Sequence, residues 1–108
     1  KKVAEAEMLA LGEFTTNIYL GPPEGKKVAS IDLWIRVSDP EVASFVRSRS
    51  EVFREKTSYA LSELFDSKVN LLRSEGKLEA RERIREALNS ALKTGKVEEV
   101  FIQNLIVE

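Results

Sequence analysis

Hydrophobic and polar residues alternate through residues 31–37, IDLWIRV, which is the period of a β-strand with one buried face. The face that points toward a core carries Ile31, Leu33, Ile35 and Val37. The opposite face carries Asp32, Trp34 and Arg36, so the only tryptophan of the chain lies among charged residues. The pattern therefore predicts a strand and raises the question of what covers Trp34.

Two further segments flank this strand at its N-terminal side. Residues 14–20, FTTNIYL, are rich in β-branched and aromatic types and predict a second strand. The turn sequence GPPEG at 21–25 cannot continue that strand, so it predicts an antiparallel hairpin with residues 28–37. Residues 1–12, KKVAEAEMLALG, lack strict alternation, and we expect a connector that is either a short helix or an ordered linker and that ends at Gly12.

The pattern then changes to a helical period. The segment Ser38-Asp39-Pro40-Glu41 has the residues of a helix start, and a long helix is predicted over 41–65. A second helical stripe resumes near Leu78 and ends before Gly95. The apolar positions expected to face the sheet are Val42, Phe45, Val46, Val52, Phe53, Ala60, Leu61, Leu64, Leu78, Ile84, Leu88, Ala91 and Leu92.

Residues 97–107, VEEVFIQNLIV, predict a last strand with apolar residues on both faces, which is typical of a central strand covered on both sides. The predicted order is strand, strand, helix, helix, strand. This order indicates an α+β domain of two layers, in which a sheet of about three strands packs on a long helical hairpin.

Composition narrows the classes of function. The 108 residues carry 17 basic and 18 acidic side chains, a net charge of -1, which argues against nucleic-acid binding. The charge is uneven, because residues 66–96 hold eight bases and five acids, whereas residues 97–108 hold three acids and no base. The chain has no cysteine and no histidine, which excludes thiolate nucleophiles, imidazole or thiolate zinc sites and Ser-His mechanisms.

The remaining polar motifs are better explained as surface features than as catalytic groups. Glu98-Glu99 and the pair Glu5 and Glu7 have neither the predicted burial nor the close partner that general acid–base catalysis requires. The segment Ser74-Glu75-Gly76-Lys77 lacks the earlier glycine of a phosphate-binding loop and reads as a helix boundary. We therefore expect no enzyme activity and no bound cofactor or metal.

The candidate site is an interaction surface on the polar face of the hairpin, formed by Tyr19, Trp34 and Arg36. A large aromatic side chain on a polar strand face is enriched at protein interfaces. Two explanations remain open for Trp34. The N-terminal segment could cover it through Val3, Met8 and Leu9, or a partner or neighbouring subunit could do so.

Three segments of the chain form a recognisable pattern. The first two are Glu13 to Ile18, EFTTNI, and Lys27 to Leu33, KVASIDL. The third is a closing segment with Leu72, Gly76-Lys77, Ile84, Asn89, Leu92, Gly95, Val97, Val100 and Phe101 at its characteristic positions. Together with the order of elements, these segments resemble the periplasmic domain of the flagellar FliL family. Glu13 stands where the family usually has proline, Ile18 where it has leucine, and Gln103-Asn104 interrupts its aromatic closing strand.

The resemblance implies a stomatin-like (SPFH) domain over residues 13–108. It also implies an upstream transmembrane helix at the inner membrane, which agrees with a chain that begins at Lys1 rather than methionine. The expected function is a non-enzymatic ring of copies of the chain around the torque-generating stator, in contact with its ion-channel subunit and affecting motility. The alternative is a membrane scaffold or ligand-binding domain of the same fold that is unrelated to the flagellum.

Overall fold

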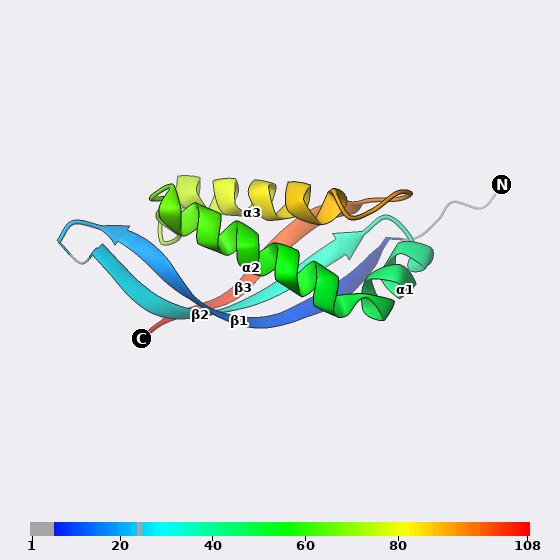
Figure 1. Cartoon of the computed structure of the whole chain (residues 1–108), viewed down its shortest axis with the longest axis horizontal. Coiled ribbons are helices and arrows are strands. Elements are labelled where there is room, and N and C mark those ends of the chain that lie inside the picture. Colours follow the sequence, from blue (N-terminus) through cyan, green and yellow to red (C-terminus); the bar gives the residue numbers. More distant parts are fainter. Residues whose placement is uncertain (1–5, 24) are drawn as a thin grey trace.

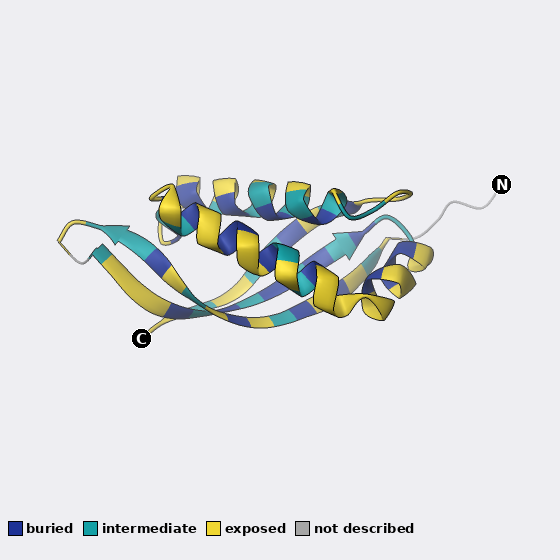
Figure 2. Cartoon of the chain, in the orientation of Figure 1, coloured by how far each residue is buried: buried dark blue, intermediate teal, exposed yellow. Residues whose placement is uncertain are grey.

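The computed structural model describes residues 6–23 and 25–108, which form a three-stranded antiparallel sheet and three helices. Figure 1 shows the helices on one face of the sheet. The sheet order is β1-β2-β3, so the strands follow one another in space as they do along the chain. This arrangement confirms the predicted α+β class. Figure 2 shows that buried residues lie where the helices and the sheet face each other.

The hairpin is longer than the sequence indicated, because β1 spans Glu7–Gly21 and β2 spans Gly25–Val37. The predicted helix before Gly12 is wrong for residues 7–12, which pair with β2 from Glu7↔Val37 onward. Residues 1–5 lie outside the described residues. Gly12, expected to end a helix, follows a register shift in β1 and has a φ of +102°, a conformation that glycine adopts without steric penalty.

Arg54 stabilises the irregular part of β1, where the register shifts between Ala10 and Gly12. Its guanidinium donates hydrogen bonds to the carbonyl oxygens of Leu11 and Glu13, the second at 2.9 Å, and stacks 4.0 Å from the centre of the Phe14 ring. A strand irregularity leaves backbone carbonyls without ladder partners, and a planar guanidinium supplies several donors at once. Arg54 belongs to the helix α2 (Ser50–Asp66), so these contacts attach the helical layer to the edge strand β1.

The predicted helix over 41–65 is two helices, α1 (Pro40–Ser48) and α2 (Ser50–Asp66). Asp39 caps α1, since its carboxylate accepts from the backbone amides of Glu41 and Val42 at 2.9 and 3.1 Å. At Arg49 the backbone leaves the helical region, with φ −128° and ψ 40°. Because this break rotates the stripe, Phe45 and Val52 are 38% and 44% exposed instead of in the core.

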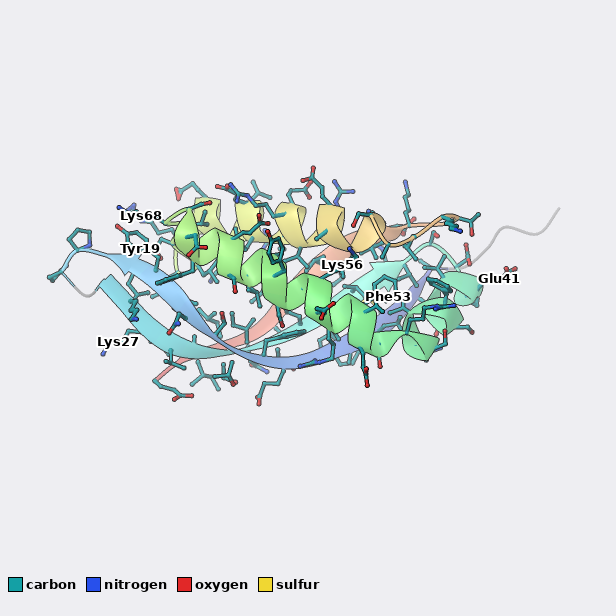
Figure 3. All side chains as sticks on the ribbon, in the orientation of Figure 1. Tyr19, Lys27, Glu41, Phe53, Lys56 and Lys68 are labelled. Carbon is teal, nitrogen blue, oxygen red and sulfur yellow. The ribbon has the colours of Figure 1, made fainter. Side chains whose placement is uncertain are left out.

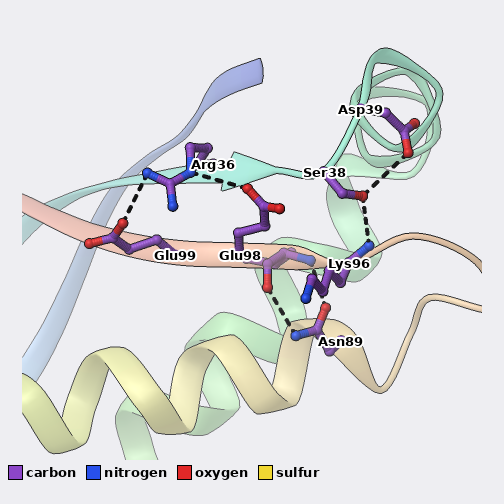
Figure 4. Close-up of polar contacts among 8 residues, drawn as sticks. Arg36, Ser38, Asp39, Asn89, Lys96, Glu98 and Glu99 are labelled. Carbon is purple, nitrogen blue, oxygen red and sulfur yellow. Dashed lines mark hydrogen bonds and ion pairs between the residues drawn. The ribbon is translucent and has the colours of Figure 1, made fainter. Parts of the chain in front are cut away.

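The third helix, α3, spans Ser74–Asn89 and begins earlier than predicted. Its buried stripe is Gly76, Ala80, Ile84 and Leu88, whereas Leu78, predicted to face the core, is 57% exposed. A side-chain bridge joins its end to the next strand: Asn89 donates to the carbonyl of Val97 at 3.1 Å and accepts from its amide at 2.7 Å (Figure 4).

The last strand, β3 (Val97–Val107), is an edge strand and not the central one, so the prediction from its two apolar faces is wrong. Register shifts against β2 fall between Arg36 and Val37 and between Asp32 and Leu33. Each extra residue reverses the alternation. In consequence Val97, Val100, Ile102, Leu105 and Val107 pair with inward residues of β2.

Candidate interaction surface

No segment of residues 6–23 or 25–108 covers the face of the sheet opposite the helices (Figure 1), and we call it the bare face. Cross-strand pairing places its residues in rows, because directly opposed residues of antiparallel strands point to the same side. The rows are Met8–Arg36–Glu99, Ala10–Trp34–Phe101, Glu13–Asp32–Asn104 and Thr15–Ser30–Ile106. The predicted polar face of the hairpin is therefore present, and β3 extends it.

Trp34 lies in the aromatic row of the bare face, with Ala10 on one side and Phe101 on the other, and both aromatic residues are half-buried. Leu9, expected to help cover Trp34, is 6% exposed and points to the opposite face, toward the helices. Met8 is on the same face, in the row of Arg36, and is 44% exposed. Val3 lies outside the described residues. Cover of Trp34 through Leu9 is therefore wrong.

Arg36 is next to Trp34 on the same strand face and is paired with two carboxylates (Figure 4). Its Nε lies 3.2 Å from Glu98 Oε1, and its Nη1 lies 3.1 Å from Glu99 Oε1. The Arg36 side chain is 41% exposed, so these ion pairs contribute only a few tenths of a kcal/mol to about 1 kcal/mol of stability. The pairs do neutralise Arg36, which leaves the surroundings of Trp34 acidic.

The row beside Trp34 places two carboxylates opposite each other. Glu13 of β1 and Asp32 of β2 are direct cross-strand partners, and Asn104 of β3 completes the row. Like charges at such positions are destabilising. Neither carboxylate forms an ion pair with any of the described residues. The sequence pattern showed Asp32 on this face, but the partnership with Glu13 depends on the register shift at Gly12 and was not predicted.

Tyr19 is not brought together with Trp34. It pairs with Lys26 at the hairpin end of the sheet, eight residues along β2 from Trp34, which is roughly 26 Å in an extended strand. Its backbone also bridges to Asn70, and it borders a hollow with Lys68 and Arg73. Figure 3 shows Tyr19, Lys27 and Lys68 at the same end of the molecule. The predicted surface thus divides into two separate places.

A second hollow, not predicted from the sequence, is a cleft of about 740 Å³ between α1, the start of α2 and the loop that follows α3. Its apolar lining includes Phe45, Val52 and Leu92, with Arg49 and Lys93 among its charged residues. The guanidinium of Arg49 lies 5.1 Å from the centre of the Phe45 ring. The helix break at Arg49 creates this cleft, so a continuous helical stripe could not have indicated it.

Two observations describe the ionisable side chains of the described residues. No group of three Asp or Glu side chains is placed to hold a metal ion in residues 6–23 and 25–108. A hydrogen bond from Arg85 lowers the pKa of Glu82, and the same contact raises the pKa of Arg85. The two side chains form an ion pair on α3, 30% exposed for Arg85 and 54% exposed for Glu82.

None of the helices in the described part of the chain has the length and apolar character that crossing a bilayer requires.

Comparisons with known proteins agree with the resemblance found from the sequence. A search of curated proteins finds no match. The model of the family described as "Flagellar basal body-associated protein FliL" matches residues 8–107, which include every strand and helix of the structure except Glu7 at the start of β1. The match begins at Met8 and so also includes residues that the sequence alone assigned to a connector. The chain therefore belongs to the FliL family of flagellar basal body-associated proteins.

Proposed function

We propose that the chain is a non-enzymatic component of the flagellar motor that forms a ring of its own copies around the torque-generating stator and supports stator activity. The observation that carries the proposal is the family match over residues 8–107, since membership implies a basal-body-associated role in motility. The ring, the contact with the stator ion-channel subunit and an upstream inner-membrane helix with a periplasmic domain belong to the proposal.

The bare face supports a role in assembly. It presents two half-buried aromatic side chains, Trp34 and Phe101, together with Ile106, which is 61% exposed. Apolar residues grouped on an uncovered face are typical of protein interfaces. A shared membrane tether raises the effective concentration of the copies, so that interfaces too weak to hold in dilute solution can hold there. We therefore expect the isolated chain to associate weakly and the tethered chain to assemble.

A deletion strain tests the proposed function. Loss of the gene should reduce swimming and the recruitment of fluorescently labelled stators to the motor, and a wild-type copy supplied in trans should restore both. Unchanged motility together with unchanged stator recruitment would contradict the proposed role of the chain in supporting the stator. In reconstituted membranes that contain the stator, a tethered chain that remained monomeric would contradict the ring.

A further inference from the structure

We infer that the bare face is the docking site for a second copy of this chain, which contacts it through the turn between α2 and α3. This inference rests on the proposed self-association and assigns the two surfaces that meet. We call the second surface the basic turn and define it by Lys68, Leu72 and Arg73.

The charge around Trp34 defines what the bare face can bind. Four carboxylates, those of Glu13, Asp32, Glu98 and Glu99, accompany one guanidinium, that of Arg36, which leaves a net charge of −3. Two of the carboxylates, Glu13 and Asp32, oppose each other without a basic partner among the described residues. A ligand that supplies cationic groups beside apolar surface would relieve this repulsion and cover the aromatic row.

The basic turn has the complementary chemistry. Lys68 and Arg73 line the same hollow, and neither forms an ion pair with the rest of the described chain. Leu72 between them is 48% exposed. Glu75 and Glu79 border the side of this turn that faces α3, where Glu79 is paired with Arg83 at 2.6 Å. Lys26 and Lys27 of the neighbouring hairpin add two further positive charges at this end of the molecule. Figure 3 places Lys27 and Lys68 at this end.

Charge also decides between two ways of using the bare face. If two bare faces met across a two-fold axis, the Glu13–Asp32 row, near the middle of the face, would oppose the same row of the partner. Four carboxylates would then lie together, which is unfavourable in a partly desolvated interface. Docking of the basic turn onto the bare face avoids this, and it is a heterologous contact of the kind that builds rings when the rotation closes.

The absence of cysteine from the chain permits a direct test. Two single-cysteine variants are made: Asn104→Cys on the bare face and Leu72→Cys on the basic turn. Both carry an N-terminal polyhistidine tag and are bound together to vesicles that contain nickel-chelating lipids. A short bismaleimide is then added to cross-link cysteines that lie close to each other. We expect a cross-linked dimer that contains one of each variant. Ser62→Cys, at an exposed position of α2, is the control and should give little product with Asn104→Cys.

Charge reversal provides a second readout. The double variant Glu13→Lys/Asp32→Lys should lower the yield of the mixed dimer about tenfold or more, because like charges would now meet in the interface. Lys68→Glu/Arg73→Glu in the other copy should restore the yield. Circular dichroism and thermal melting of each variant confirm that it folds.

The failures of the inference and of the proposed function are distinguishable. If Asn104→Cys cross-links to itself, or if amine cross-linking shows oligomers without the mixed cysteine product, the assignment of these two surfaces is overturned and the ring stands. If the tethered chain shows no oligomer with any cross-linker, the proposed ring is overturned together with the inference.

Discussion

Gly76→Ala tests how closely the helical layer packs at the start of α3. Gly76 is buried in the first turns of α3, and a Cβ added there would lie 1.8 Å from the carbonyl oxygen of Asn70 and 2.6 Å from its carbonyl carbon. These atoms belong to the backbone, so no side-chain rotation can relieve the contact. The helix and the Asn70 segment would have to separate by more than about 1 Å.

The segment that would move is itself anchored. Asn70 donates to the carbonyl of Leu20 at 3.1 Å and accepts from the amide of Leu72 at 2.9 Å, and its own carbonyl accepts from the amide of Arg73 at 3.2 Å. Overpacking costs about 1–3 kcal/mol, and each hydrogen bond lost costs about 1 kcal/mol more. The helix propensity of alanine over glycine offsets about 1 kcal/mol. We expect the free energy of unfolding to fall by about 2–4 kcal/mol.

Urea denaturation followed by circular dichroism measures this change. The midpoint should fall by about 1–2 M while the slope with urea concentration stays constant. Glu86→Ala is the matched control, because Glu86 is exposed on the same helix and its replacement should change the free energy of unfolding by less than about 0.5 kcal/mol. A Gly76→Ala variant as stable as the wild type, or more stable, would show that α3 does not lie against the Asn70 carbonyl.

Three further predictions concern other parts of the molecule. Asn89→Ala removes both hydrogen bonds to Val97 and should lower the free energy of unfolding by about 2 kcal/mol in the same assay; no change would mean that the bridge from α3 to β3 contributes nothing. Trp34→Ala should cost less than about 2 kcal/mol, because Trp34 is only half-buried in the monomer, but it should impair assembly on vesicles; a loss above about 3 kcal/mol, typical of a fully buried aromatic, would show that this chain itself covers Trp34. The pKa of Glu82 should lie below its ordinary value of 4.5 and return toward it in Arg85→Ala, as measured by NMR titration of the carboxyl carbon; an unchanged pKa in that variant would show that the pair does not form in solution. Because the folded-state pKa is lowered, the stabilisation by this pair is present above pH 4.5 and is lost as the pH falls through the folded-state pKa.

The sequence predicted the elements whose signal is local. The alternation in IDLWIRV identified β2 and put Trp34 on the bare face, and the turn sequence GPPEG identified the hairpin. Asp39 and Pro40 identified the start of α1, because the cap is formed by residues next to one another in the chain. These features need no knowledge of which segments meet in space.

The features that were missed depend on contacts between distant segments. Residues 7–12 form a strand because β2 offers them partners, and Arg54, from α2, stabilises the irregularity beside Gly12. Register shifts in β3 reversed its alternation, so its apolar residues suggested two buried faces where there is one. The break at Arg49 has neither proline nor glycine to mark it, which is why the stripe through Phe45 and Val52 looked continuous. For the candidate surface, the alternation put Trp34 and Arg36 on one strand face, and the structure does the same. Tyr19 lies far from them because the hairpin is long, and the alternation alone did not give that length.

The register shifts in β3 also bear on how the molecule avoids uncontrolled polymerisation. An exposed edge strand of eleven residues offers a template to which another chain could add by backbone hydrogen bonding, the first step toward an aggregate. Extra residues near Glu98 and Gln103 interrupt the regular spacing of donors and acceptors along that edge, so an incoming strand could pair over only short stretches. Edge addition at β3 is thereby discouraged, which agrees with the proposed use of the bare face, where side chains determine the partner, for assembly.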